Sequence, residues 1–584
     1  MKKVNFLVGT ILAVLFLLCS TKAFAQKQIN IDFAAEVDTI KNFLGGNKGP
    51  GSYGTYLNEL GMRYLRTHDY HGAADYCFYS SFWNTDESGN FTTINPSFDP
   101  DNPLHYDWTE TDNQLMQIIS GGFEIYFRIG VSYPNPMYPM ATYEPPVDSY
   151  LDTLSFSRFA ELCRRTVMHY NDGWDDGYYY DIKYFELWNE PGGIFWEGSA
   201  VQYCRMFQAV SDSIKSFDPS IKIGGPGAVP TTTIGLHPEY REGFIRFLDS
   251  TDTDIDFYSW HIYGAKNPFC LKEYADTIRT LLDISGFIDA EIHITEVNHN
   301  LDSTLDSFVP SPLGAAYYLS LVLTAQKSPV DLFLWYPCAA FSVGDILYTP
   351  SANSMIAFHL MQEETPIIVH STGEEVIDGH FDTDTTNFMV LAAKSEDENK
   401  LYILVSNYHS DNVDYEVNIT NLPWGFADSI EVRRNLIVDT LNFAEFVDTI
   451  SGGDSLTIFQ PDMAAPSVLF LRLQKLSPTN VRENIADVID VVDVFPNPFN
   501  SACKINVETQ NLASPPEIAI YDLRGNVICR FDGYRADCDA NADFIPGQYT
   551  FQWHPDEKIS SGIYLVRIVF GDERTFSKRI VYVR

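Results

Sequence analysis

The hydrophobic pattern of residues 40–340 alternates short apolar runs with segments whose apolar residues recur every three to four positions. Short apolar runs are typical of buried strands, and the 3–4 spacing is typical of amphipathic helices. Eight strands interleaved with helices predict a parallel (β/α)8 barrel, an α/β fold. The expected strands are 42–47, 62–68, 123–131, 182–188, 221–225, 255–263, 291–297 and 332–336, and the clearest helical segments are 159–170, 201–217, 271–284 and 313–325.

The pattern changes after the barrel, where strand-like runs are separated by turns rich in Asp, Asn, Gly and Ser. We therefore expect the barrel to occupy residues 26–350 and a β-sandwich to occupy 351–475, to which residues 26–39 could add a strand. A polar linker, 476–490, precedes a strand-rich unit of residues 491–584, which we expect to be a small immunoglobulin-like β-domain.

The first 25 residues have the pattern of a signal peptide. Lys2 and Lys3 precede an apolar run, 6–18, and Ala23-Phe24-Ala25 has the form of a cleavage site. No later apolar run of 18 residues or more predicts a transmembrane helix. We therefore expect an exported protein, in which disulfides can form.

The composition of the chain limits the classes of molecule that it can bind. The chain has 39 Lys and Arg against 78 Asp and Glu, a net charge of -39. Such an acidic chain binds phosphate backbones poorly, so nucleic acid is excluded as a partner, whereas a neutral sugar polymer is allowed. The nine cysteines include no C-x-x-C pair, which argues against a zinc site or a redox motif. The sequence shows no other constellation of metal ligands, so we expect no metal site. Cys529 and Cys538 are a plausible local disulfide.

Two carboxylates follow predicted barrel strands. The run 184–188 ends in Asn189-Glu190-Pro191, and Pro191 stops the strand because it has no N–H to donate. Glu190 is thus placed at the C-terminal mouth, where barrel enzymes keep their reactive groups. Glu296 ends the strand three further along, nearly opposite in a barrel of eight. Unless each is an ordinary surface acid, the two converge as the acid and base that glycosidic cleavage needs, about 5–5.5 Å apart for a retaining reaction.

The motifs around these acids resemble those of the retaining (β/α)8 glycoside hydrolases. Within that clan the chain resembles family 39, the β-xylosidase and α-L-iduronidase family, over residues 32–473. The matching motifs are Tyr-Leu-Arg-Thr-His (64–68), Phe-Glu-Leu-Trp-Asn-Glu-Pro (185–191), Asp-Phe-Tyr-Ser-Trp-His-Ile-Tyr (256–263) and Ile-Thr-Glu-Val-Asn (294–298). The resemblance implies that Glu190 is the acid/base, Glu296 is the nucleophile and Asn189 binds the sugar 2-hydroxyl. The sequence has no glycine-rich phosphate loop of the G-x-x-x-x-G-K type, and we expect no cofactor.

Further substrate-binding candidates share strand faces. His261 and Tyr263 lie two apart, as do Arg66 and His68, so each pair is expected to point into the site. His261 could instead be a core histidine, and Arg66 could belong to a buried salt bridge. Trp335 could stack on a sugar ring or pack in the core. His293 lies three positions before Glu296, so on a regular strand it points away, and only a bulge would bring it inward.

The C-terminal unit resembles the sorting domain of type IX secretion. Its motifs are Val-Phe-Pro-Asn-Pro-Phe-Asn (494–500), Ile-Ala-Ile-Tyr-Asp-Leu-Arg-Gly (518–525) and Ser-Ser-Gly-Ile-Tyr-Leu-Val-Arg (560–567). The resemblance implies type IX machinery as a partner and a secreted or cell-surface location; the alternative is a glycan-binding module.

For the whole chain we expect a secreted, β-xylosidase-like retaining glycoside hydrolase. An endo-acting xylanase or glucanase and a non-catalytic surface glycan-binding protein remain alternatives. Loops 75–112 and 133–150 would decide between a cleft and a pocket.

Overall fold

The computed structural model describes most of the chain outside the predicted signal peptide. The described residues are 26–68, 83–85, 91–95, 97–130, 153–192, 196, 198–228, 238–265, 267–300, 304–376, 387–438, 444–476, 491–495, 499–508, 517–522, 527–532, 535, 536, 538, 540–545, 548–556, 558–569, 575–582 and 584. They form two compact units, Met1–Lys475 and Leu476–Arg584. The predicted signal peptide, linker 477–490, loop 133–150 and much of loop 75–112 lie outside the described residues.

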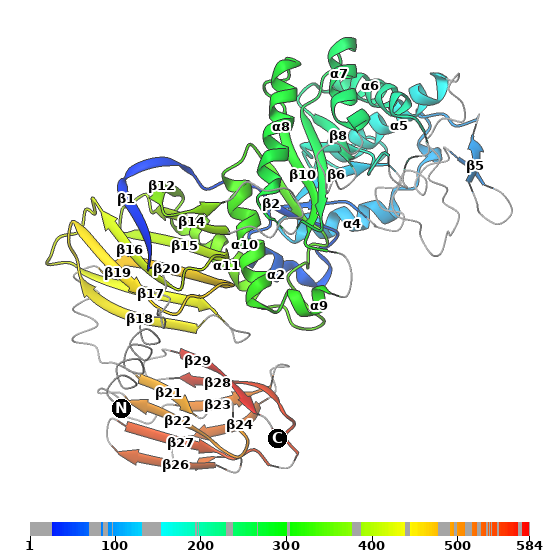
Figure 1. Cartoon of the computed structure of the whole chain (residues 1–584). Helices are drawn as coiled ribbons and strands as arrows, with labels where there is room; N and C mark the ends of the chain where they lie inside the picture. The colour runs from blue at the N-terminus through cyan, green and yellow to red at the C-terminus, as the bar shows by residue number, and fades with distance from the viewer. Residues whose placement is uncertain are drawn as a thin grey trace, which may run out of the picture. The chain divides into compact units, whose positions relative to one another are not determined.

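Eight parallel strands close into a barrel in chain order, as the alternating pattern predicted. Figure 1 shows these strands with their helices around the outside. The strands are β2 (Leu44–Asn47), β3 (Tyr64–Arg66), β6 (Glu124–Ile129), β7 (Tyr184–Leu187), β8 (Lys222–Ala228), β9 (Phe257–Tyr263), β10 (Glu291–Asn298) and β11 (Leu332–Trp335).

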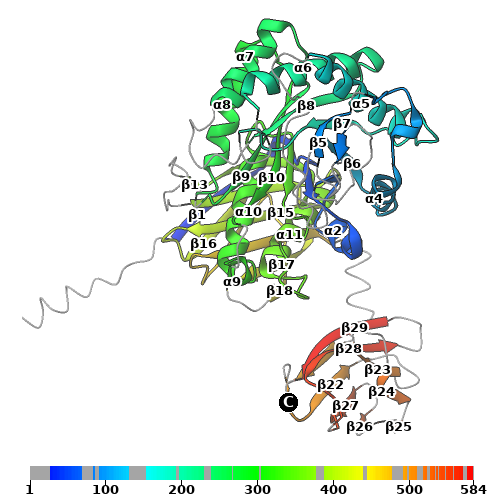
Figure 2. The same cartoon turned by 90° about the vertical axis from the view of Figure 1, so that its right-hand side faces the viewer.

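Helices follow most barrel strands and pack against their outer face (Figure 2). The α-helices are α2 (Gly54–Glu59), α4 (Thr109–Ser120), α5 (Thr153–Asn171), α6 (Ala200–Phe217), α7 (Glu242–Thr251), α8 (Cys270–Ile284), α9 (Leu305–Phe308), α10 (Pro312–Gln326) and α11 (Pro350–Glu364). Short 3₁₀ turns span Gly51–Tyr53, Pro103–His105 and Pro238–Tyr240, and a small hairpin pairs β4 (Trp83–Thr85) with β5 (Phe91–Ile94).

The lower half of the barrel interior, at the N-terminal ends of the strands, is filled by side chains. A molecule can therefore enter the barrel only at the C-terminal ends of the strands. A buried cluster inside the barrel is largely aromatic and consists of Tyr64, Tyr126, Tyr184, Phe257, Leu332 and Leu334. Barrels of this kind carry their active sites at the C-terminal mouth.

The sandwich region is one continuous antiparallel-rich sheet that curls around its own core. The N-terminal strand β1 (Gln26–Thr39) lies within this sheet, where it pairs antiparallel with β12 and parallel with β16. The other strands are β12 (Ile367–Thr372), β13 (Glu375–Val376), β14 (Asn387–Lys394), β15 (Lys400–His409), β16 (Asp414–Thr420), β17 (Ser429–Ile437), β18 (Ala444–Ser451), β19 (Ser455–Gln460) and β20 (Ser467–Lys475).

Helix α10 joins the barrel to this sheet. Every residue from Gly314 to Gln326 is buried, as expected of a helix that is apolar all round. Figure 1 shows α10 between the barrel strands and the sheet, and Ser406 of β15 donates a hydrogen bond to the Ala316 carbonyl at 2.8 Å. Residues of β14 and β15 on one face of the sheet thus belong to the apolar core of the barrel, while those on the other face belong to the core of the sandwich.

The C-terminal unit is a second β-sandwich with its own core. One sheet contains β21 (Val491–Phe495), β22 (Cys503–Glu508), β26 (Ala540–Ile545) and β27 (Gln548–Trp553). The other contains β23 (Glu517–Tyr521), β24 (Val527–Asp532), β25 (Arg535–Ala536), β28 (Gly562–Val569) and β29 (Thr575–Tyr582). Cys529 and Cys538 form the disulfide that their spacing suggested. None of the helices in the described part of the chain is long and apolar enough to span a membrane.

Candidate active site

The chain turns sharply after β7, which places two adjacent polar residues at the mouth. Trp188 and Glu190 both have positive φ angles, 74° and 45°. The Glu190 amide donates to the Gly227 carbonyl of β8 at 2.9 Å, which fixes the turn. The Trp188 ring packs outward on Phe159 and Trp196, while Asn189 and Glu190 face the barrel axis.

Strand β10 brings the second carboxylate to the same place through a β-bulge. Two residues of β10, Thr295 and Glu296, lie opposite one register step on β9, so the alternation of faces is interrupted. The Thr295 hydroxyl donates to Glu186 inside the barrel, and Glu296 also points inward.

The bulge also brings His293 to the inner face, so the regular-strand expectation that it points outward is wrong. His293 Nδ1 lies 3.0 Å from the Tyr126 hydroxyl, and its ring stacks on Phe257 at 4.3 Å. These are the aromatic residues that fill the lower barrel, so His293 lies below the mouth.

Glu190 and Glu296 converge on one histidine. His261 Nδ1 lies 2.7 Å from Glu190 Oε1 and 3.6 Å from Glu296 Oε2. One ligand-type atom from each of the three residues lies within 4.8 Å of those of the other two. The Glu296 side chain is 6% exposed and the Glu190 side chain 15%, so both carboxylates border the mouth.

Glu296 is held as an anion by its neighbours. Arg66 Nη1 donates to its Oε1 at 2.8 Å, His68 Nε2 lies 2.9 Å from the same oxygen, and the Tyr263 hydroxyl donates to Oε2 at 2.6 Å. Burial alone would raise the pKa of Glu296, but the charges of His261, His68 and Arg66 and the hydrogen bond from His68 outweigh it and hold that pKa far below its usual range. Burial, followed by the negative charge of Glu296, raises the pKa of Tyr263, which therefore stays a donor.

Arg66 connects several residues of the site by hydrogen bonds. It is fully buried, and besides Glu296 it donates to Asn189 Oδ1 at 3.0 Å, Asn47 Oδ1 at 2.8 Å and Glu186 Oε2 at 2.6 Å. Arg66 thus contacts Glu296 and also forms a buried salt bridge with Glu186.

Trp335 does not face the mouth of the barrel. It is 1% exposed and packs on Phe333, Tyr318 and Phe341 outside the barrel, so the stacking expectation is corrected and the core-packing alternative holds. The next residue, Tyr336, does place an aromatic ring near the site: its ring centroid lies 5.5 Å from that of His68 and 6.4 Å from that of Tyr263.

Sequence reasoning also missed Glu186, which is buried within the barrel beside Arg66. A signal was present, because an acid in the middle of the apolar run Tyr-Phe-Glu-Leu-Trp must face a charged partner if it is buried.

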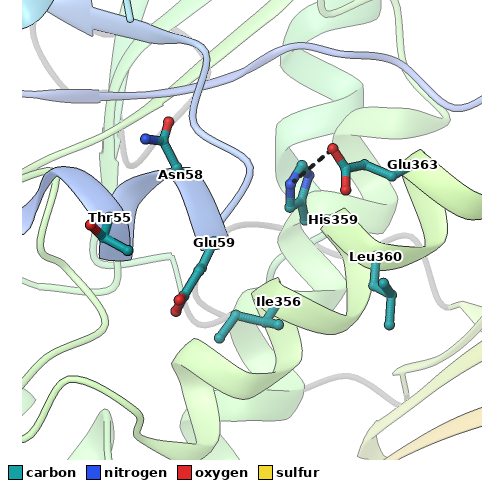
Figure 3. Close-up of a pocket in the computed structure, with 7 residues that line it drawn as sticks. All are labelled: Thr55, Asn58, Glu59, Ile356, His359, Leu360 and Glu363. Carbon is teal, nitrogen blue, oxygen red and sulfur yellow. Dashed lines mark ion pairs between the residues drawn. The ribbon is translucent and has the colours of Figure 1, made fainter. Parts of the chain in front are cut away.

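The spacing of Glu190, His261 and Glu296 is also one that metal ligands can have. Arg66 already places a positive charge on Glu296, which disfavours a second cation there. A separate hollow of about 450 Å³ lies on the outer wall between α2 and α11 (Figure 3). None of the residues that line it was a site candidate, and His359 pairs within it with Glu363 at 3.6 Å.

The model of the family described as glycosyl hydrolases family 39 matches residues 99–402, more than half of the chain. The chain belongs to that family. A second model, described as a secretion system C-terminal sorting domain, matches residues 493–582.

Individual proteins agree with this family assignment. A β-xylosidase of Geobacillus stearothermophilus is 28% identical over 171 residues, which are 26% of this chain and 32% of the relative. The chain thus spans about a third of the length of the curated relatives it matches.

Solved structures show the same fold. The glucosidase of Croceicoccus marinus aligns with a TM-score of 0.61 at 19% identity, over 78% of this chain and all of that one. The GH39 enzyme of Xanthomonas axonopodis pv. citri aligns with a TM-score of 0.57 at 16% identity, over 79% of this chain and all of that one.

Proposed function

We propose that this family 39 member hydrolyses O-glycosidic bonds by double displacement, with Glu296 as nucleophile and Glu190 as acid/base. The observation that carries the proposal is the pairing of the two carboxylates on His261, with one ligand-type atom of each of the three residues within 4.8 Å of the others. Retaining glycosidases place their carboxyl groups about 5–5.5 Å apart and inverting enzymes about 6.5–9.5 Å apart, so the close pair favours retention.

The two carboxylates have environments suited to different roles. Glu296 has Arg66, His68 and Tyr263 around it, which favour its ionised form and aim it at the anomeric carbon. Glu190 is the more exposed of the two and has the His261 ring nitrogen against its Oε1.

In the first step the Glu296 carboxylate forms a bond to the anomeric carbon as the bond to the leaving oxygen breaks. Glu190 gives its proton to that oxygen. In the second step Glu190 takes a proton from water, whose oxygen attacks the anomeric carbon and releases the Glu296 carboxylate. Asn189, held by Arg66 at 3.0 Å, is placed to bind the sugar 2-hydroxyl. Tyr263 and His68 border these groups. The side chains of Arg66 and His261 are fully buried, so we assign them support of the carboxylates in place of sugar contact.

The proposed substrate class is oligo- or polysaccharide with β-xylosidase-like specificity. Support comes from the curated β-xylosidase relative and from the family match. The sorting domain supports export by the type IX machinery to the cell surface or the medium.

The test is hydrolysis of a panel of 4-nitrophenyl glycosides by the full chain, with Glu296→Gln and Glu190→Gln as matched variants. We expect cleavage by the wild type alone, and NMR of the first product should show the anomeric configuration of the substrate. Glycan binding without cleavage by any of the three proteins would favour the binding-protein alternative. A first product of opposite configuration would overturn retention, and oligosaccharides released from xylan or glucan would indicate endo action.

A further inference from the structure

A third carboxylate, Glu186, lies beneath the catalytic pair. Its side chain is fully buried on β7, and each of its oxygens has a partner. Oε2 accepts from Arg66 Nε at 2.6 Å, and Oε1 accepts from the Thr295 hydroxyl at 2.8 Å. No sugar can reach such a group, so any effect on catalysis must pass through its neighbours.

The first of these neighbours is Arg66, which Glu186 holds at the Nε side of its guanidinium. The two terminal nitrogens are thereby directed at the mouth, where Nη1 meets Glu296 at 2.8 Å and Nη2 meets Asn189 at 3.0 Å. A planar guanidinium has fixed donor directions, so fixing Nε also fixes the other two nitrogens. Arg66 shares its positive charge between Glu186 and Glu296. Glu186 therefore limits how far Arg66 can lower the pKa of Glu296.

The second neighbour is His261, which faces Glu190 through Nδ1. The other ring nitrogen of His261 and the Glu186 carboxylate both lie beside Gly227: a Cβ built there would lie 3.5 Å from His261 Nε2 and 3.3 Å from Glu186 Oε1. His261 Nε2 is buried and makes no hydrogen bond within the described part of the chain. The Glu186 charge therefore acts on His261 from the side opposite Glu190.

Other elements around Glu186 supply polar and charged groups as well. Burial raises the pKa of Glu186, but Arg66, hydrogen bonds from Ser259 and Thr295, and the charge of His261 lower it overall. Arg128 of β6 is buried and lies in register with Glu186, and Glu296 is present through Arg66. Tyr126, Tyr203 and His293 also interact electrostatically with Glu186.

We propose that Glu186 is a positioning residue for glycoside cleavage, which orients Arg66 toward Glu296 and Asn189 and supplies the counter-charge behind His261. This inference rests on the proposed function, because it assigns a role to Glu186 through the two carboxylates that act in that reaction.

The experiment compares Glu186→Gln with Glu186→Asp in the full chain, using hydrolysis of 4-nitrophenyl β-D-xyloside across pH. Glu186→Gln removes the charge at constant size, and we expect kcat to fall by about 10- to 100-fold, by analogy with the loss of residues that orient metal-binding side chains. KM should change by less than about twofold, because Glu186 touches no sugar. The alkaline limb of the profile should move to lower pH, since losing a buried negative charge makes the site release its catalytic proton more easily.

Glu186→Asp keeps the charge, so its alkaline limb should stay at the wild-type pH although kcat falls. The matched control is Glu291→Gln, a charge removal at another inward position of the barrel, where Tyr184 donates to Glu291 at 2.7 Å. We expect this control to lower the melting temperature and leave both limbs of the profile in place.

The proposal is overturned if Glu186→Gln keeps the wild-type kcat, or if the Gln and Asp variants lose equal activity with unmoved limbs, as a merely structural role would give. Turnover retained by Glu296→Gln would instead refute the proposed function. A crystal structure of Glu186→Ala gives a readout independent of substrate. We expect Arg66 to lose its contact with Glu296 or Asn189, and unchanged contacts would overturn the positioning role even if no glycoside is cleaved.

Discussion

Replacing Tyr263 by Phe removes one hydroxyl from the site and almost nothing else. That hydroxyl donates to Glu296 Oε2 at 2.6 Å. A hydrogen bond to a charged group contributes about 1.5–3 kcal/mol, and one pKa unit corresponds to about 1.4 kcal/mol. Loss of the bond should therefore raise the pKa of Glu296 by about 1–2 units. Arg66 and His68 still contact its other oxygen, so the carboxylate should remain ionised at neutral pH.

The assay is the pH dependence of kcat/KM, whose acidic limb reports ionisation of the nucleophile in the free enzyme. A depressed pKa keeps Glu296 reactive down to low pH, so the variant should lose activity earlier as the pH falls. The acidic limb should move about 1–2 pH units toward neutrality.

Tyr184→Phe is the control, because it removes an equivalent hydroxyl that donates to Glu291 at 2.7 Å. That bond lies within the filled lower half of the barrel, so its loss should leave the limb in place. An acidic limb that stays put in Tyr263→Phe, or moves to lower pH, would refute the assignment of Glu296 as the ionised nucleophile held by Tyr263.

Three further outcomes are expected. Trp335→Ala should destabilise the barrel by about 3–5 kcal/mol and leave KM unchanged, because the side chain lies in the core and touches no sugar. Denaturant unfolding and steady-state kinetics measure the two effects, and a raised KM in folded protein would contradict the expectation. Burial raises the pKa of Glu291, but a hydrogen bond and charge from His293, and hydrogen bonds from Lys222 and Tyr184, lower it overall. The stability that Glu291 adds to the folded protein is therefore present above about pH 4 and decreases as the pH falls further. Glu291→Gln should therefore flatten the loss of melting temperature between pH 5 and about 2, and an equally steep loss would count against this. Reducing the Cys529–Cys538 disulfide, which closes a nine-residue separation, should cost the C-terminal unit about 2–3 kcal/mol, read as a lower midpoint for that unit alone; an unchanged midpoint would contradict it.

The barrel could be predicted because its strands and helices differ in hydrophobic period, and because Pro191 marks where one strand must stop. The meeting of Glu190 and Glu296 could be predicted from the order of the barrel strands and from the motif around Glu190, since strands three apart in a ring of eight lie nearly opposite across the mouth.

The expectations for His293 and Trp335 were wrong because of local structure that the hydrophobic period of a sequence does not show. The bulge between Ile294 and Glu296 shifts the faces of β10, so counting back by twos from Glu296 placed His293 on the wrong side. The run Leu332–Trp335 is apolar on both faces, so its pattern could not tell that Trp335 points away from the barrel axis.

The place of β1 limits how the catalytic part can be cut out for study. Gln26 lies beside Asp414 in the sheet, and β1 has β12 on its other side. A fragment that ends with α11, after the last barrel helix, would leave β1 with both edges bare, and such edges recruit strands from other molecules. The shortest fragment that we expect to express without aggregation therefore runs from β1 through β20, and shorter fragments should aggregate.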